Sequence, residues 1–390
     1  MPDYFTDVVE PRSPEDLAEA MGWASTRQQT IELGGHFSKR LMGGPAAAAN
    51  MTISTAAMRR VRQYEPRDLT ISVEAGISYC ELRSLLAVHH QMIPLDPPYA
   101  DTATIGGIIA CNCSGPRRRL YGTARDLVIG MQFATLEGKL VESGGMVVKN
   151  VAGLDMSKLM IGSFGTLAAI AVVNFKLIPQ SPCERTFRFS FGSLDEAVAA
   201  RDAILTSPLD PAAIDLLNPA AAATAKMEKP AWVLAVWAGG NAAAIARYER
   251  ELAAMGAQAI PVGEESAFWR AIQDFTPRYL DAHEDGAVVR VPCTLKELRA
   301  AMQPIPGSAI ARAGSGVCYA YFEHSGDAAV FAAETAREYS ETVVEFAPEN
   351  RKEEMDLWPA PGQDLEIMRR IKHMFDPQQL LNRGRLYRRI

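Results

Sequence analysis

Three glycine-rich clusters occupy the first half of the chain, at residues 34–44, 106–115 and 144–165. Glycine allows left-handed backbone and a close approach of other atoms to the main chain, at a cost of about 0.5–1 kcal/mol per site in regular structure. Consecutive exposed N–H groups in such loops form nests that bind phosphate oxygens. A turn would explain one cluster. Three clusters, each after an expected strand or helix, predict one ligand that contacts several loops.

The second cluster lies within the stretch TATIGGIIACNCSG, residues 102–115, which allows three interpretations: a metal site, a membrane segment or a cradle for a large cofactor. Zinc or an iron–sulfur cluster needs about four convergent soft ligands, and no second cysteine pair accompanies Cys111 and Cys113. The most apolar run, at residues 159–175, is interrupted by small polar residues and is too short for a spanning helix. The cofactor cradle is therefore favoured, and no metal is expected.

The composition narrows the class of protein. A chain of 390 residues exceeds what one compact core usually holds, so we expect two domains. The net charge of -6 argues against a broad nucleic-acid-binding surface, and no nucleic-acid partner is expected. Residues 1–13 lack the apolar core of a secretory signal. We therefore expect a cytoplasmic protein whose six cysteines are small, reduced, mostly buried thiols.

Local signals in the first half predict several short elements. Ser13, followed by Pro14 and two acidic residues, predicts a helix through Met21, because the hydroxyl caps free N–H groups and proline needs none. Ser78 and Glu81 predict a capping box at the start of another helix. The other expected elements are strands at 29–33 and 69–76, a hairpin at 126–140 turning at Glu137-Gly138, a helix at 154–160, and a strand at the β-branched end of 161–177.

From residue 183 to about residue 347, expected strands alternate with expected helices. This pattern predicts an antiparallel sheet with helices on one face, and an α+β protein overall. A final helix is expected at 364–375. The expected strands are 214–217, 232–237, 287–291, 316–322 and 343–346, and the expected helices between them are 194–205, 242–255, 295–302 and 327–339.

A Rossmann dinucleotide site is the obvious competitor for the glycine clusters. That site needs GxGxxG between a strand and a helix, with an acidic residue about twenty positions further on. No such motif occurs, and GSFGTLA at residues 162–168 precedes an expected strand. A dinucleotide would therefore have to bind in a different mode.

Six segments carry a recognisable pattern: VVEPRSPEDLAEAM, ISVEAGISYCELRSLL, IPLDPPYADTATIGGIIACNCSGPRR, YGTARDLVIG, VKNVAGLDMSKLMIGSFGTLAAI and FDPQQLLNRGRLY. Together they resemble the vanillyl-alcohol-oxidase-like flavoproteins, whose FAD domain is called the PCMH type. The resemblance covers most of residues 1–180 and about the last fifteen residues. Within that family, SGPRRRLYGTARDLVIG and GGMVVKNVAGLDMSKLMIGSFG are most similar to the FAD-binding E subunits of bacterial glycolate oxidases, and ESAFWRAIQDF and GAVVRVPC are similar to their middle region.

The resemblance implies three regions. Residues 1–180 would form a PCMH-type FAD-binding domain of two α+β subdomains. Residues 181–347 would form an α+β cap domain for the substrate, built on the antiparallel sheet with helices on one face. Residues 348–390 would return to the FAD domain. The implied cofactor is FAD.

The resemblance also implies which residues contact FAD. Those of the first loop would face the pyrophosphate, with Lys39 neutralising its charge, and those of the second would continue from the phosphates along the ribityl and flavin edge. The implied set is Gly34, Gly35, His36, Ser38 and Lys39, then Thr104, Ile105, Gly106, Gly107, Asn112, Ser114 and Gly115, then Gly122, Asp126 and Val128, then Gly162, Ser163, Gly165 and Ile170, and finally Asn382 with Arg385.

Several residues keep two interpretations. Some relatives attach FAD through a histidine in a similar GGH loop, whereas His36 is more simply a hydrogen-bonding residue. His324 resembles a metal-binding stretch of related dehydrogenases, but the second histidine of that stretch is missing here. The run of arginines at 117–119 is either a solvated face or an attractor for an acidic partner or an anionic substrate.

Oxidation of a 2-hydroxy acid needs cations for the carboxylate and a base for the hydroxyl. We expect Arg290 and Arg385 to hold the carboxylate, with Tyr319 or Tyr321 nearby, while the sequence of the cap offers no clear base. The leading hypothesis is the FAD-binding subunit of a glycolate oxidase complex, with a paralogous FAD subunit and an iron–sulfur subunit as partners and any membrane contact made through a partner. The alternatives are a free-standing FAD-linked oxidase of a lactate-like acid and a non-catalytic assembly subunit that carries FAD.

Overall fold

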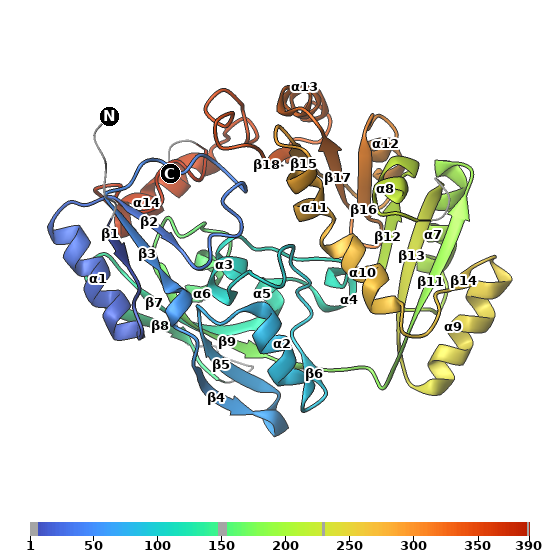
Figure 1. Cartoon of the computed structure of the whole chain (residues 1–390), viewed down its shortest axis with the longest axis horizontal. Helices are drawn as coiled ribbons and strands as arrows, with labels where there is room; N and C mark the ends of the chain where they lie inside the picture. The colour runs from blue at the N-terminus through green and yellow to red at the C-terminus, as the bar shows by residue number, and fades with distance from the viewer. Residues whose placement is uncertain (1–6, 147–153, 228–230, 388–389) are drawn as a thin grey trace. The chain divides into compact units, whose positions relative to one another are not determined.

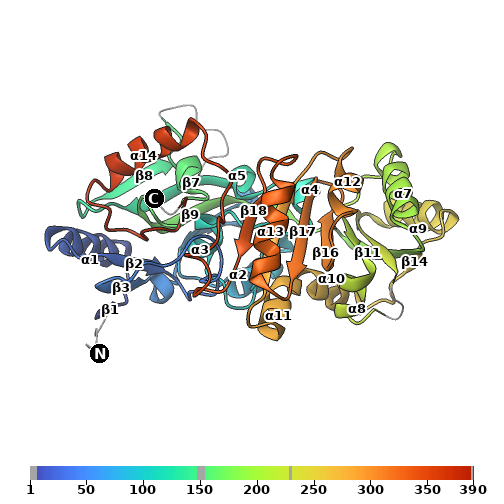
Figure 2. The same cartoon turned by 90° about the horizontal axis from the view of Figure 1, so that it is seen from above.

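A computed structural model describes residues 7–146, 154–227, 231–387 and 390. The chain divides into two compact units (Figures 1 and 2). Unit 1 comprises Met1–Cys113, Thr123–Gln180 and Ala360–Ile390, and unit 2 comprises Ser114–Gly122 and Ser181–Pro359. The domain limits expected from the sequence, 1–180, 181–347 and 348–390, differ from this division at residues 114–122 and 348–359.

Unit 1 begins with a small parallel sheet of three strands in the order β1 (Asp7–Val9), β3 (Met51–Ser54) and β2 (Ile31–Gly34). Helix α1 (Pro14–Thr26) starts where the sequence predicts, since the Ser13 side chain accepts a hydrogen bond of 3.0 Å from the Asp16 N–H. Its apolar side chains join a core that includes residues of β2, β3 and the C-terminal segment. The C-terminal segment thus belongs to the first core of the chain.

The second sheet of unit 1 is antiparallel, with strand order β4-β5-β9-β7-β8. Strand β5 is buried along its whole length, and β7 and β8 form the predicted hairpin. The bounds of its strands are β4 (Val61–Glu65), β5 (Thr70–Glu74), β7 (Val128–Ala134), β8 (Leu140–Gly144) and β9 (Ala169–Lys176). The other elements are α2 (Tyr79–Ala87), α3 (Ile105–Ala110), α5 (Ala124–Leu127), α6 (Ser157–Met160), α14 (Asp364–Phe375), the strand pair β6 (Gln91–Met92) and β10 (Ile178–Pro179), and the short 3-10 helices η1 (Thr55–Ala57) and η2 (Pro66–Asp68).

Unit 2 is built on one antiparallel sheet of eight strands, in the order β14-β11-β13-β12-β16-β17-β15-β18. The strands are β11 (Cys183–Phe191), β12 (Ala213–Leu217), β13 (Trp232–Gly240), β14 (Gln258–Ala259), β15 (Ala287–Pro292), β16 (Ser308–Arg312), β17 (Val317–Phe322) and β18 (Val343–Phe346). The helices are α4 (Arg118–Tyr121), α7 (Leu194–Thr206), α8 (Pro219–Thr224), α9 (Ala242–Ala254), α10 (Glu265–Gln273), α11 (Phe275–Ala282), α12 (Leu298–Met302) and α13 (Ser325–Thr335).

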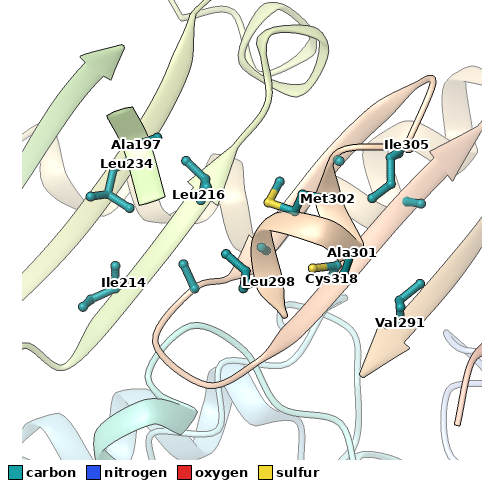
Figure 3. Packing of buried hydrophobic residues seen from close by; sticks show 14 of the residues in the cluster. Ala197, Ile214, Leu216, Leu234, Val291, Leu298, Ala301, Met302, Ile305 and Cys318 are labelled. Carbon is teal, nitrogen blue, oxygen red and sulfur yellow. The ribbon is translucent and has the colours of Figure 1, made fainter. Parts of the chain in front are cut away.

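The two faces of this sheet differ in character. One face is apolar and packs against α7, α9, α12 and α13, in a cluster that includes Leu216, Leu234, Val291 and Leu298 (Figure 3). Residues that alternate with these point to the other face, where helices α10 and α11 pack. There the Trp269 indole N–H donates to the Thr186 hydroxyl at 2.9 Å. The period of two in a strand therefore separates an apolar core from a face that carries polar groups.

The α+β class and the antiparallel sheets are confirmed, and α14 has the predicted bounds. Several strands were absent from the prediction, among them β11 and β16. The alternation of Phe187, Phe189 and Phe191 is a period-two signal that would have found β11. Strand β16 has the sequence SAIAR, whose small residues carry little strand propensity, so its state was decided by its neighbours in the sheet.

Candidate functional site

A cleft of about 940 Å³, open to solvent, lies within unit 1. Most of its walls come from four separate parts of the chain: residues 31–40, the segment around α3, the start of β9 with the preceding loop, and the C-terminal segment. All three glycine clusters reach this cleft through at least one residue, although residues 147–153 of the third lie outside the described residues.

The glycines of the cleft bring its loops against one another. A Cβ on Gly35 would stand 2.2 Å from the Thr104 hydroxyl oxygen, so the first and second loops meet only because this position has no side chain. Gly165 has a φ of +67° and a Cβ there would lie 2.8 Å from Nδ2 of Asn382. Both distances are shorter than real Cβ contacts allow, and glycine is required at these positions by the neighbouring chain.

Asn382 joins the C-terminal segment to two walls of the cleft. Its Oδ1 accepts a hydrogen bond of 2.7 Å from the Leu33 N–H. Its Nδ2 donates to the carbonyl oxygens of Leu33 at 3.0 Å and Phe164 at 2.8 Å. The side-chain amide thus forms backbone-like hydrogen bonds that link the end of β2 to the loop before β9.

Beneath Asn382 lies a buried ion pair on α14. The Lys372 ammonium donates to Asp376 at 2.6 Å, to the Thr166 carbonyl at 2.7 Å and to the Leu381 carbonyl at 3.1 Å. The Asp376 carboxylate also accepts from the N–H groups of Leu380 and Leu381, both at 2.8 Å. Both side chains are buried, and burial lowers the pKa of Lys372. The pair fixes the turn that presents Asn382.

Arg385 holds the first loop from the other side. Its Nη1 donates to the carbonyl oxygens of Arg40 at 3.1 Å and Gly44 at 3.0 Å, and its Nη2 donates to that of Met42 at 2.5 Å. The guanidinium lines the cleft while it binds these backbone groups. Its expected role in holding a substrate carboxylate stays a prediction.

The charges on the cleft favour an anion. Lys39 lines the cleft with a residue exposure of 7%, and in the described ranges no carboxylate lies within ion-pair distance of its ammonium. The Nδ1–H of His36 donates to the Thr102 carbonyl at 2.7 Å, and Arg40 pairs with Glu32 at 2.6 Å. A buried cation without an anionic partner is costly unless a ligand neutralises it. A diphosphate between glycine-rich loops fits these residues.

Twelve residues of the expected site line this cleft: Gly34, Gly35, His36, Ser38, Lys39, Thr104, Gly106, Gly107, Gly165, Ile170, Asn382 and Arg385. Ile105, Asn112, Asp126, Val128, Gly162 and Ser163 belong to the same unit without lining it, and Ser114, Gly115 and Gly122 belong to unit 2. Sequence reasoning did not name Phe37 or Phe164, which also line the cleft, nor Lys372 and Asp376 beneath it. Asp376 lies in the quoted segment FDPQQLLNRGRLY, so a signal for it was present.

Two segments of the chain match known protein families. Residues 6–144 match the family described as "FAD binding domain", and residues 350–386 match the family described as "FAD linked oxidases, C-terminal domain". The chain contains an FAD-binding domain. The FAD-binding domain supplies the first two glycine clusters, and the match at residues 350–386 contains the Lys372–Asp376 pair and Asn382.

The curated relatives include oxidases and dehydrogenases. The chain is 34% identical over 184 residues to glycolate oxidase subunit GlcE of Escherichia coli, covering 47% of this chain and 52% of that protein. It is 26% identical over 218 residues to glycolate oxidase subunit GlcD of Bacillus subtilis (56% and 46%). It is 30% identical over 215 residues to the mitochondrial D-lactate dehydrogenase [cytochrome] of Arabidopsis thaliana (54% and 37%). The chain thus spans about half the length, or less, of these relatives.

Solved structures confirm that the FAD-binding domain has the PCMH-type fold. A structure of 4-ethylphenol oxidase from Gulosibacter chungangensis matches with a TM-score of 0.74 at 15% identity, covering 97% of this chain and 88% of that one. p-Cresol methylhydroxylase matches with a TM-score of 0.72 at 15% identity and the same coverage. Alkyldihydroxyacetonephosphate synthase matches with a TM-score of 0.73 at 18% identity, covering 96% and 76%. At these identities the likeness concerns the fold alone.

The remaining expected residues lie in unit 2, on the polar face of its sheet. Arg290 on β15 pairs with Glu345 on β18 at 3.2 Å. Tyr319 and Tyr321 lie on β17, and the Tyr321 hydroxyl shares a hydrogen bond of 2.9 Å with Thr276. Burial raises the pKa of Glu345, with Arg290 opposing the shift. Sequence reasoning missed Glu345 because its partners are set by strand register.

A second ion pair on this face joins Arg312 to Asp215, both of them buried. The Arg312 guanidinium also lies 5.5 Å from the centroid of the Tyr319 ring. Burial raises the pKa of both Glu345 and Tyr319, and the positive charge of Arg118 opposes both shifts. The polar face therefore places the guanidinium groups of three arginines near Glu345 and Tyr319.

The other arginines of the run 117–119 also have partners within unit 2. The Arg117 guanidinium lies 4.6 Å from the centroid of the Trp237 ring. Arg119 donates to Asp210 at 2.8 Å and to the Pro211 carbonyl at 2.5 Å. The run is thus packed against its own unit, which neither of the two sequence interpretations anticipated.

His324 lies 3.7 Å from the Asp285 carboxylate. Across the described residues, no group of three or more His, Cys, Asp and Glu side chains is arranged to hold a metal ion. Within the same ranges, no helix combines the length and the apolar character needed to span a bilayer.

Proposed function

We propose that this chain is the FAD-binding subunit of a glycolate oxidase complex that oxidises glycolate to glyoxylate. Three things support the proposal: the FAD-binding domain, the anion-favouring cleft within it, and the likeness to the subunits GlcE and GlcD. The proposed partners are a paralogous FAD subunit and an iron–sulfur subunit that receives the electrons. The proposed location is cytoplasmic, with contact to the inner membrane only through a partner.

The observation that carries the cofactor assignment is the buried Lys39 in a cleft of glycine-rich loops. Lys39 would neutralise the diphosphate of FAD, and the N–H groups of the first loop, residues 35–39, would donate to its oxygens. Arg385 and Asn382 would keep the first and third loops at the spacing that the cofactor needs. When bound, FAD supplies the acceptor for a hydride from the substrate carbon.

The polar face of unit 2 supplies the groups that a 2-hydroxy acid requires. Arg290 would bind the substrate carboxylate as a bidentate partner, since its guanidinium is held in place by Glu345. Glu345 would accept the hydroxyl proton, because burial raises the pKa of this carboxyl toward the range useful for a base. Tyr319 would orient the substrate hydroxyl. We prefer Tyr319 to Tyr321 for this role because the Tyr321 hydroxyl already forms a hydrogen bond with Thr276.

The first experiment tests the cofactor. The purified chain should bind FAD and become yellow, and Lys39→Met should weaken FAD binding about tenfold to a hundredfold, since a hydrogen bond to a charged group contributes about 1.5–3 kcal/mol. Lys139→Met, at an exposed position of the β7–β8 hairpin paired with Glu137, is the matched control and should bind FAD normally. A wild-type chain that takes up no flavin from excess FAD would overturn the assignment.

The second experiment tests the substrate. The chain with FAD is mixed anaerobically with glycolate or with D-lactate, alone and together with the subunits that co-purify with it. Loss of flavin absorbance with glycolate, followed by reduction of a co-purified iron–sulfur centre, is the expected result. Arg290→Gln should raise the glycolate concentration that gives half the maximal rate of flavin reduction. Glu345→Gln should lower the maximal rate of flavin reduction itself. Flavin that no 2-hydroxy acid reduces, in any of these mixtures, favours the assembly subunit.

The alternative function is a free-standing FAD-linked oxidoreductase of a lactate-like acid. The likeness to the D-lactate dehydrogenases of Arabidopsis thaliana and Archaeoglobus fulgidus, 30% and 27% identical over about half of this chain, favours this alternative. Rapid reduction of the isolated chain by D-lactate, with no partner present, would decide for it.

A further inference from the structure

Two cysteines meet on the apolar side of the unit 2 sheet. Cys318 lies on β17 and is fully buried, whereas Cys293 follows β15 directly and is half-buried. Their sulfur atoms are 3.9 Å apart. Cys318 belongs to the apolar cluster that α12 covers (Figure 3). All six cysteines are in the described part of the chain. The strands that carry Cys318 and directly precede Cys293 are adjacent in the sheet.

Strand register places both thiols on the same side of the sheet. Val291 pairs with Cys318, and the Cys293 N–H donates to the Gly316 carbonyl at 3.0 Å, which continues that register. Cys293 and Cys318 are therefore diagonal neighbours on adjacent antiparallel strands. A disulfide has a sulfur–sulfur length of about 2.0 Å. The two sulfur atoms therefore need to approach by about 2 Å in total.

The surroundings make the two thiols unequal. The contact with Cys318 lowers the pKa of Cys293, while the same contact and burial raise the pKa of Cys318. The guanidinium of Arg201 is buried close to both thiols, and it is held by the carbonyl oxygens of Ala313 at 3.2 Å and Leu295 at 3.0 Å. A half-buried thiol that loses its proton more readily, beside a buried thiol, is the arrangement of an attacking and a resolving cysteine.

We propose that Cys293 and Cys318 are a redox modification site, which a peroxide or a small disulfide converts into an intrachain disulfide between β15 and β17. With hydrogen peroxide, the Cys293 thiolate takes an oxygen to form a sulfenic acid and hydroxide leaves as water. The Cys318 sulfur then attacks the Cys293 sulfur, the S–S bond forms, and the second oxygen leaves as water. Two thiols lose two protons and two electrons, and one peroxide becomes two waters.

The site does not depend on the proposed function, because both thiols lie on the face of the sheet opposite to Arg290 and Tyr319. A disulfide would nevertheless fix β15 to β17, the two strands that carry those residues. Because small thiol compounds reduce exposed or strained disulfides readily, the half-buried position of Cys293 makes the bond reversible.

The test treats the full chain, folded and loaded with FAD, with hydrogen peroxide or with oxidised glutathione, and then blocks the remaining thiols with an alkylating reagent. Peptide mass mapping without reduction should find the Cys293 and Cys318 peptides linked, with the loss of two hydrogen atoms. A later treatment with dithiothreitol should restore both thiols. Cys183, a half-buried cysteine of the same unit, should be recovered in alkylated form or as a single adduct.

Two variants separate the proposal from general oxidation. In Cys318→Ser, Cys293 should stop at a mixed disulfide with glutathione, since no resolving thiol remains. Cys183→Ser should form the Cys293–Cys318 bond as the wild type does, and circular dichroism checks that each variant is folded. Recovery of Cys293 and Cys318 as separately alkylated peptides, under conditions that oxidise Cys183, would overturn the proposal. A bond from Cys293 to a second chain would overturn it as well.

Discussion

The two units build their polar sites in opposite ways. In unit 1, side chains bind the main chain of distant loops: Asn382 binds Leu33 and Phe164, and Arg385 binds the carbonyls of residues 40–44. In unit 2, side chains of neighbouring strands bind one another, as in the pairs of Arg290 with Glu345 and Arg312 with Asp215. The first arrangement leaves N–H groups of the first loop and a lysine for a large anion, and the second pairs opposite charges across the strands of one sheet.

This difference predicts how each unit responds to substitution. A change in the C-terminal segment should affect the whole FAD cleft, because several loops depend on it. A change on the polar face of unit 2 should remain local, because a sheet of eight strands holds the backbone in place. The following substitutions test the comparison in order of decreasing effect.

Lys372→Met should give the largest effect. It leaves the Asp376 carboxylate buried without its cation, and breaking a buried ion pair in this way costs about 3–5 kcal/mol. Denaturant unfolding should show the loss of stability, and FAD titration should show the loss of binding. Arg369→Met, on an exposed position of the same helix, should change neither. Unaltered FAD binding in Lys372→Met would remove the link between the C-terminal segment and the cleft.

Asp215→Asn is the counterpart in unit 2. The substitution keeps the size of the side chain and removes the charge that faces Arg312, at a cost of about 1.5–3 kcal/mol. Thermal unfolding should report this loss while FAD affinity stays within a factor of about two. Asp210→Asn removes an exposed ion pair with Arg119 and should cost less than about 1 kcal/mol. A large drop in FAD affinity in Asp215→Asn would show that a change in unit 2 is not confined to that unit.

Gly35→Ala should alter the cleft with a smaller loss of stability than the two ion-pair variants. The added methyl group overlaps the Thr104 side chain, and overpacking of this kind costs about 1–3 kcal/mol. Because Gly35 and Thr104 both line the cleft, FAD titration should show weaker binding, by about tenfold. Gly145→Ala, where a Cβ meets no atom within 4 Å, is the control and should bind FAD as the wild type does. Equal affinities in the two variants would argue against close contact of the first and second loops.

The smallest expected effect is a pH dependence of unit 2. Burial raises the pKa of Glu345, so the folded chain binds this proton more tightly than the unfolded chain does. The resulting stability is present below the ordinary glutamate pKa and is lost as pH rises through the raised value. Urea unfolding from acidic to neutral pH should show this decline, and Glu345→Gln should reduce its slope. A slope that is unchanged in the variant would assign the decline to other groups.

Much of the local structure followed from the residues alone. Ser13 and Pro14 start α1, and the hairpin of β7 and β8 turns at the predicted position, because capping and turn preferences act over a few residues. The glycine clusters and the resemblance led to FAD, since the motifs are long and specific. Several strands were missed, among them β16, whose sequence SAIAR has no local signal strong enough to identify it.

The sequence by itself determined many of the elements, the α+β class and the kind of cofactor, because hydrophobic period, capping and phosphate-binding loops are properties of short segments. Only the tertiary structure decided which residues meet. Leu33 and Asn382 form a hydrogen bond across a separation of 349 residues, and Glu345 faces Arg290 because of strand register. Such contacts depend on how cores pack and strands pair, and no short segment contains that information.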